Sequence, residues 1–118
     1  MQSVVPTLRI TDYARSKAFY TNGLGFTVNW EHRFEPTFPV FMEVGRDGML
    51  LYLSQHEGDC QPGGLVHLYV PDVDAWYSDL KLRGISTPQP QDEPWGNRDF
   101  RVTDPDGNRL CICTRLDS

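Results

Sequence analysis

Residues 65–84 read LVHLYVPDVDAWYSDLKLRG, and this stretch decides the fold. Aliphatic side chains alternate with other types over 65–70, which predicts a β-strand. Asp72 or Asp74 then supplies a side-chain oxygen suited to the N-cap of a helix, and Gly84 stands where a C-cap glycine belongs. The apolar residues of this helix recur on one face, which we assign to the core: Val73, Trp76, Tyr77 and Leu80.

The first half of the chain repeats this order of elements. Asp12 is the expected N-cap of a helix over 13–22, and the landmarks of the two halves correspond at an offset of about 60 positions. The corresponding landmarks are Asp12 with Asp72, Gly25 with Gly84, Phe41 with Phe100, and Asp47-Gly48 with Asp106-Gly107. The expected strands are 5–10, 26–30, 38–44 and 49–53 in the first half, and 65–70, 85–87, 99–103 and 109–113 in the second.

We therefore predict an α+β fold of two βαβββ modules in one domain over 1–118. The first module covers about 4–54, the polar and glycine-rich stretch 55–64 is a linker, and the second module covers about 65–114. A single module covers one face of its sheet with its helix and leaves the other face bare. Either two modules combine or two chains pair to bury that face, and a ligand could bind there.

Composition excludes several classes of function. The 118 residues are 39% hydrophobic and 23% charged, which is typical of a globular domain. A net charge of −5 opposes binding to a nucleic acid backbone. We find neither a membrane-spanning run nor a secretion signal. Three cysteines are an odd number, and Cys111 and Cys113 lie too close together for an ordinary disulfide within a strand. We expect a cytoplasmic protein with reduced thiols and no membrane or nucleic acid partner.

Alternation along the strands predicts which residues face away from the helices. Aliphatic side chains go under the helices, so the far face receives His67 and Tyr69 in one strand, and Tyr52 and Ser54 in another. Cys111 goes to the same side, whereas the facing of the strand over 38–44 stays open because both parities are apolar. Tyr, His, Ser and Cys side chains suit an organic ligand better than a dry core.

Several spaced motifs resemble the glyoxalase, bleomycin-resistance and dioxygenase superfamily, also called vicinal oxygen chelate proteins. The resemblance covers nearly the whole chain. It rests on the duplicated βαβββ order and on three motifs: Asp12 with Phe19-Tyr20, Leu24-Gly25-Phe26, and Asp104-Pro105-Asp106-Gly107-Asn108. Val5-Pro6, and Glu93-Pro94-Trp95-Gly96 followed by Phe100, resemble the bleomycin-binding resistance proteins in particular.

The resemblance also identifies where metal-using members of the superfamily hold a divalent ion. Those members use His, Glu or Gln, and the corresponding positions here are Val5, Tyr52, Leu65 and Cys111. Valine and leucine cannot coordinate a metal, and one phenol and one thiol do not replace the hydration shell of a divalent ion. We therefore expect no metal and no other cofactor.

The bleomycin-binding branch implies a dimer with exchanged N-terminal strands, whose interface clefts hold an unchanged aromatic ligand with a cationic tail. The resemblance places a tryptophan where this chain has His67, which favours a smaller or differently shaped ligand. Two alternatives stay open: a metal-dependent lyase, isomerase or dioxygenase of the same superfamily, and a regulatory protein that binds a peptide. The predicted ligand-binding residues are Trp30, Phe38, Tyr52, Ser54, His67, Tyr69, Trp95, Gly96 and Cys111, and none is predicted to be catalytic.

Overall fold

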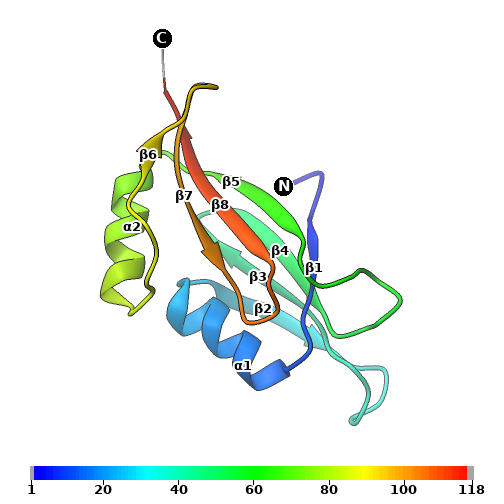
Figure 1. Ribbon diagram of the computed structural model, residues 1–118. Helices are drawn as coiled ribbons and strands as arrows, with labels where there is room; N and C mark the ends of the chain where they lie inside the picture. The colour runs from blue at the N-terminus through cyan, green and yellow to red at the C-terminus, as the bar shows by residue number, and fades with distance from the viewer. Residues whose placement is uncertain (1, 117–118) are drawn as a thin grey trace.

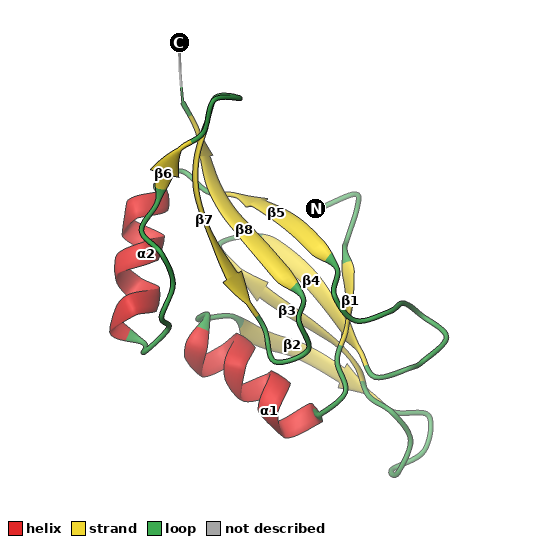
Figure 2. Ribbon diagram, viewed as in Figure 1, coloured by secondary structure: helices red, strands yellow, loops and turns green. Residues whose placement is uncertain are grey.

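The structure is a computed structural model that describes residues 2–116. It contains two four-stranded mixed sheets and two helices, so the α+β prediction is confirmed (Figures 1 and 2). Residues 1, 117 and 118 of the predicted domain lie outside the described residues. The elements are β1 (Thr7–Arg9), α1 (Tyr13–Ala18), β2 (Thr27–His32), β3 (Phe41–Arg46), β4 (Met49–Ser54), β5 (Leu65–Tyr69), α2 (Val73–Leu82), β6 (Gln91–Asp92), β7 (Asn97–Thr103) and β8 (Arg109–Arg115).

The two sheets have the same internal order, which reflects the repeat in the sequence. Sheet 1 runs β1-β4-β3-β2 and sheet 2 runs β5-β8-β7-β6. β1 pairs in parallel with β4, and β5 pairs in parallel with β8. All other strand pairs in the two sheets are antiparallel. β1 pairs with β4 of its own chain, so the exchange of this strand between two chains remains a prediction.

Helix α1 begins at the predicted cap, and α2 begins at Asp72, one of its two predicted caps. The carboxylate of Asp12 accepts a hydrogen bond from the Arg15 N–H at 2.9 Å, and that of Asp72 accepts one from the Ala75 N–H at 3.1 Å. Helix α1 is shorter than predicted, because a π-helical turn over Phe19–Gly23 replaces its last turn. Gly25 then takes a φ of 76°, and a Cβ there would lie 2.6 Å from Arg46 Nη1.

Several predicted strands differ from the structure in position or length, and three of the differences concern the later argument. Residues 85–87 form no strand, because the Thr87 hydroxyl donates to the Arg101 carbonyl and Pro88 follows. The fourth strand of sheet 2 is instead β6, further along the chain. The third strand begins at Phe41 rather than Phe38, since the Phe38 N–H donates to the Glu35 carbonyl in a turn. β2 extends to His32 and contains a bulge between Val28 and Trp30.

The helix-facing sides of both sheets contribute to one hydrophobic core. Leu8, Leu51 and Leu53 from sheet 1 are buried together with Leu68 and Leu110 from sheet 2, as alternation predicted. The facing of β3, left open by the sequence, is settled by its buried residues, Met42 and Val44. Phe41 and Glu43 therefore lie on the far face of sheet 1.

Polar side chains connect the first helix to the turn between β7 and β8. The hydroxyl of Tyr20, which is fully buried, donates to Asp104 Oδ2 at 2.7 Å. Asn108 Nδ2 donates to the same carboxylate at 2.9 Å and to the Arg9 carbonyl at 2.8 Å. These bonds hold the two sheets in a fixed relation. Within residues 2–116, both helices are too short and too polar to cross a lipid bilayer.

Candidate functional site

An aromatic cluster covers the middle of the far face of sheet 1. Trp30, Phe41 and Tyr52 come from β2, β3 and β4. Their ring centroids lie 5.8 Å apart for Trp30 and Phe41, 5.7 Å for Trp30 and Tyr52, and 5.0 Å for Phe41 and Tyr52. Trp30 remains 41% exposed. The cluster is an aromatic wall with one open side, against which a flat ring can stack.

Phe41 was missing from the predicted site. Its strand has apolar residues at both parities, so alternation could not show that Phe41 faces away from the helices. The β-branched valines at positions 40 and 44 could have indicated its facing. Valine is suited to the core side of a strand, and both Val40 and Val44 are fully buried. That parity leaves Phe41 beside Tyr52 on the far face.

A second group of aromatic and imidazole rings adjoins this wall at its loop end. A hollow of about 270 Å³ is lined by His32, Phe34, Phe41, His56 and Asp59. The rings of His32 and Phe34 meet edge to face at 4.7 Å. The sequence analysis gave neither histidine a role and missed this hollow, since His32 at the end of β2 and His56 in the loop after β4 are far apart in the sequence.

Ser54 and Phe38, two predicted ligand-binding residues, lie outside the aromatic wall. Ser54 is fully buried in the single chain, and its role as a lining residue stays a prediction. Its hydroxyl donates to Asp59 Oδ2 at 2.6 Å and accepts from the His56 N–H at 3.1 Å. Ser54 thus positions Asp59 in the wall of the hollow. Phe38 lies exposed in the loop before β3, and its carbonyl accepts from Arg33 Nη1.

The far face of sheet 2 carries the remaining predicted residues. His67 and Tyr69 of β5 are both exposed, as alternation predicted, and the Tyr69 hydroxyl accepts from Asn97 Nδ2 at 3.1 Å. The Arg115 guanidinium lies 4.5 Å from the centroid of the Tyr69 ring. His67 and Tyr69 also line a hollow of about 280 Å³ with the N-terminal segment, including Val4.

Cys111 is fully buried in the single chain, and its role as a ligand contact stays a prediction. It pairs with His67 and Arg101 in the neighbouring strands, and longer side chains around it leave it fully buried. Burial, with a smaller contribution from the nearby Asp99 carboxylate, raises the pKa of Cys111 to about 12. The thiol is therefore protonated at neutral pH, which disfavours nucleophilic attack by its sulfur.

Trp95 and Gly96 lie in the turn between β6 and β7. Gly96 has a φ of 98°, and its N–H donates to the Glu93 carbonyl at 3.1 Å. The turn presents the Trp95 ring to solvent, with 65% of the residue exposed. A tryptophan in this state is available to a ligand or to another chain.

The predicted site residues are thus divided between two sheets. Trp30, Phe38 and Tyr52 belong to sheet 1 and its loop, whereas His67, Tyr69 and Trp95 belong to sheet 2 and its turn. None of the four hollows described on residues 2–116 joins the aromatic wall to Tyr69 or Trp95. Within one chain these residues therefore lie on two separate faces.

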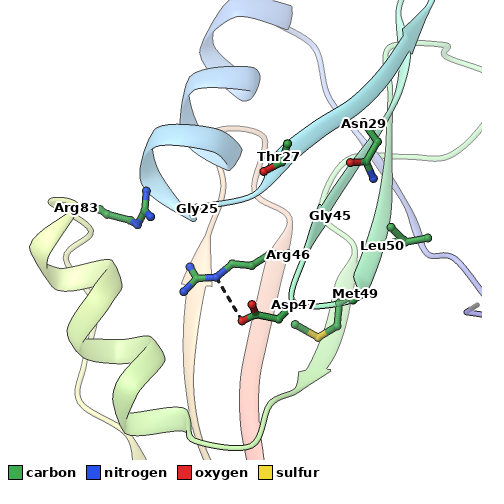
Figure 3. Close-up of a pocket in the computed structure, with 10 residues that line it drawn as sticks. Gly25, Thr27, Asn29, Gly45, Arg46, Asp47, Met49, Leu50 and Arg83 are labelled. Carbon is green, nitrogen blue, oxygen red and sulfur yellow. Dashed lines mark ion pairs between the residues drawn. The ribbon is translucent and has the colours of Figure 1, made fainter.

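The most spacious of these hollows, about 610 Å³, contains none of the predicted residues (Figure 3). It lies at the β3–β4 hairpin and includes Arg46 and Arg83. Arg46 donates to the Leu24 carbonyl at 2.7 Å, pairs with Asp79 at 3.0 Å, and covers the Trp76 ring at 3.8 Å. Its charge is used to join α2 to sheet 1, so we assign this hollow no ligand.

Metal-using members of the superfamily that this chain resembles hold a metal ion at four positions. The residues at those positions here are not suited to binding one. Val5 and Leu65 are aliphatic, Tyr52 belongs to the aromatic wall, and Cys111 offers a single soft thiol. Across residues 2–116 there is also no group of three or more His, Cys, Asp or Glu side chains arranged to hold an ion. No step that requires a metal can be built on these residues.

Comparison with known proteins adds a family and a fold. A family model described as "Glyoxalase superfamily protein" matches residues 1–118. The protein YraH of Bacillus subtilis is 28% identical over 122 residues, a match that covers 92% of this chain and 94% of YraH.

Solved structures share the fold. A member of the glyoxalase/bleomycin resistance protein/dioxygenase superfamily from Sphaerobacter thermophilus is 27% identical, with a TM-score of 0.74 over 97% of this chain and 98% of that one. A bleomycin-binding protein complexed with bleomycin is 22% identical, with a TM-score of 0.79 over 98% of this chain and 99% of that one.

Proposed function

The chain belongs to the glyoxalase superfamily, and from that membership we propose that it binds an aromatic, cationic small molecule without changing it chemically. Sequestration of a bleomycin-like antibiotic is the form of this activity that we propose. The single observation that carries the proposal is the half-exposed wall of Trp30, Phe41 and Tyr52. Each aromatic contact with a ligand ring would contribute about 0.5–1.5 kcal/mol beyond the buried area.

The division of the site between two sheets supports a homodimer. We propose that modules 4–54 and 65–114 each supply one wall, and that the cleft combines sheet 1 of one chain with sheet 2 of the other. Trp95 and Tyr69 would then face the aromatic wall across the interface. Nanomolar binding needs about −12 kcal/mol, which a cleft closed on both sides can supply more readily than one exposed wall.

The chemistry of the far faces supports binding rather than catalysis. Catalysis in the metal-using members needs hard ligands at four positions that here hold two aliphatic groups, a phenol and a thiol. The fold shared with a bleomycin-bound protein supports a ligand of that class. His67, in place of the tryptophan that the resemblance implies, supports a less extended stacking surface on sheet 2.

Isothermal titration calorimetry with a panel of bleomycins, with and without copper, tests the proposal. We expect binding by the unmodified chain, and Trp30→Ala to weaken it by at least about tenfold, the equivalent of about 1.4 kcal/mol. Leu82→Ala removes an exposed apolar residue of α2 away from both far faces and should leave binding unchanged.

Two outcomes would overturn the proposal. One is the absence of heat with every member of the panel. The other is a stoichiometric divalent ion found by metal analysis of the purified protein, which would instead support the metal-dependent enzymes of the superfamily.

A further inference from the structure

Arg9, on the far face of sheet 1, has a buried guanidinium atom without a partner. It follows the buried Leu8 in β1, so alternation places its side chain on the face away from the core. The residue is half-buried, and within residues 2–116 its Nε atom is buried and donates no hydrogen bond. No other buried side-chain nitrogen or oxygen atom of these residues lacks a partner. Burying a charged donor is costly without an acceptor, which the chain itself does not supply here.

The other half-buried arginines of the described chain all have partners. Arg33 donates to a backbone carbonyl, whereas Arg46 and Arg98 form ion pairs with aspartates. Over the same residues, Arg9 forms no ion pair and lies over no aromatic ring. The fold of the single chain therefore leaves the charge of Arg9 without a role.

The linker after β4 lies beside Arg9. Arg9 pairs with Ser54, whose hydroxyl donates to Asp59 Oδ2 at 2.6 Å. The Cys60 thiol donates to the Thr7 carbonyl at 3.6 Å, which places the linker over β1. Burial and the Asp59 carboxylate raise the pKa of Cys60, and the charge of Arg9 opposes that rise. Arg9, Asp59 and Cys60 are therefore close neighbours at the end of sheet 1.

The charges around Arg9 favour a partner with a single negative charge. Strands β1 and β4 and the linker 55–64 contain no second Arg or Lys, whereas the linker contains the carboxylate of Asp59. A carboxylate matches one guanidinium, because its two oxygens accept parallel hydrogen bonds from the planar group. A phosphate monoester carries about −1.5 to −2 charges at pH 7, which Asp59 would oppose more strongly.

We propose that Arg9 binds a carboxylate group of the ligand. The inference rests on the proposed function for the ring of the ligand, and it adds an anionic group that the proposed function does not include. Arg9 and Tyr52 are diagonal neighbours on the far face, because Arg9 pairs with Ser54 and Thr7 pairs with Tyr52. A ligand whose ring lies on the aromatic wall can therefore direct a carboxylate to Arg9.

Nuclear magnetic resonance of the ¹⁵N-labelled chain tests this with 2-naphthoate and the neutral 2-naphthamide, two probes of similar shape. We expect the naphthoate to shift the backbone amides of Arg9 and Ser54 and to bind at least about tenfold more tightly than the amide. Arg9→Met, which removes the charge and keeps an unbranched side chain, should abolish that preference. Arg9→Lys should retain only part of it, because an ammonium group lacks the planar fork. 2-Naphthyl phosphate should bind no more tightly than the naphthoate.

Urea unfolding of Arg9→Met gives a second measurement. Because the buried Nε atom has no partner within residues 2–116, removing the guanidinium should not lower the free energy of unfolding. A loss of stability would show that the folded chain already uses this charge, and would overturn the inference. Arg15→Met is the matched control: it makes the same substitution on helix α1, where Arg15 is exposed and pairs with Asp106, so the preference for naphthoate should persist.

Retention of the preference in Arg9→Met, its loss in Arg15→Met, or tighter binding of the phosphate would also overturn the inference. So would a lower particle mass of Arg9→Met in light scattering, since a carboxylate of a second copy would then be the partner of Arg9. Equal binding of both probes, lost in Trp30→Ala, would remove the carboxylate site and leave the proposed function standing. A preference abolished by Arg9→Met, with an affinity unchanged in Trp30→Ala, would keep the carboxylate site and remove the aromatic wall. Binding of neither probe would remove the carboxylate site, while the bleomycin titrations decide the proposed function independently.

Discussion

At the scale of single residues, the sheet face on which a side chain lies could be predicted from the sequence. Whether neighbouring side chains bury it there could not. Alternation placed Tyr52, His67 and Tyr69 on the far faces, where the structure has them. The same pattern made Ser54 and Cys111 appear open, whereas both are fully buried. The burial of a small side chain depends on the residues of neighbouring strands, which are far away in the sequence. Period-2 alternation contains no information about those residues.

The three thiols give a residue-scale prediction. Cys111 and Cys113 are fully buried with raised pKa values, mainly through desolvation, whereas Cys60 is partly accessible. An aromatic disulfide reagent at pH 8 should therefore label one thiol of the native chain, and all three only after denaturation. Cys60→Ser is the control and should leave no thiol that reacts in the native state. Rapid labelling of two or more thiols in the folded chain would contradict the assignment.

The buried hydroxyl of Tyr20 gives a second prediction at the scale of single residues. Tyr20→Phe removes its hydrogen bond to Asp104 and should lower the free energy of unfolding by about 1–2 kcal/mol in urea titrations. Burial and the Asp104 carboxylate raise the pKa of Tyr20 well above its usual value of 10.0, so the folded chain holds this proton where the unfolded chain loses it. Stability of the unmodified chain should therefore fall as the pH rises above 10, and less steeply in Tyr20→Phe.

Tyr77→Phe is the comparison for that experiment. Tyr77 packs edge to face on Phe100 at 5.5 Å, and within residues 2–116 its hydroxyl forms no hydrogen bond. The substitution should change the unfolding free energy by less than about 0.5 kcal/mol. Equal losses in the two variants would show that the Asp104 bond is not what makes Tyr20 stabilising.

At the scale of the elements, predictions succeeded where the signal is local. The N-caps Asp12 and Asp72 accept hydrogen bonds from amides three residues ahead, and such short-range chemistry is visible in the sequence. The strand β6 and the bulge in β2 were missed, because both depend on register with a neighbouring strand. The bulge matters for the site, since it falls between Val28 and Trp30 and so changes the strand's pairing directly before the aromatic wall.

The capping interpretation can be measured directly. Asp72→Ala removes the side-chain acceptor for the Ala75 N–H and should lower the free energy of unfolding by about 1 kcal/mol. Glu57→Ala removes a carboxylate from an exposed loop and should leave it unchanged within about 0.5 kcal/mol. Chemical denaturation followed by circular dichroism measures both, and an unaffected Asp72→Ala would contradict a capping role.

At the scale of the whole molecule, the repeat was predicted from the 60-residue offset, but the division of the site was not. Local patterns assign residues to the far face of each sheet and do not say whether the two faces meet. The structure holds the sheets together through a shared core and through Tyr20, Asp104 and Asn108, and leaves Trp30 on one sheet and Trp95 on the other. This separation is the observation on which the second chain that we propose rests.

Mixing two damaged chains tests that arrangement. Trp30→Ala damages the sheet 1 wall and Trp95→Ala the sheet 2 wall, so homodimers of either variant should bind a ligand weakly. If each cleft joins sheet 1 of one chain to sheet 2 of the other, a mixed dimer has one intact cleft and one damaged on both walls. Unfolding and refolding the variants together in equal amounts should then restore high-affinity sites in about a quarter of all clefts, since half of the dimers would be mixed. Calorimetry counts those sites, and light scattering confirms two chains per particle; a mixture with no tight sites would show that both walls of each cleft come from the same chain.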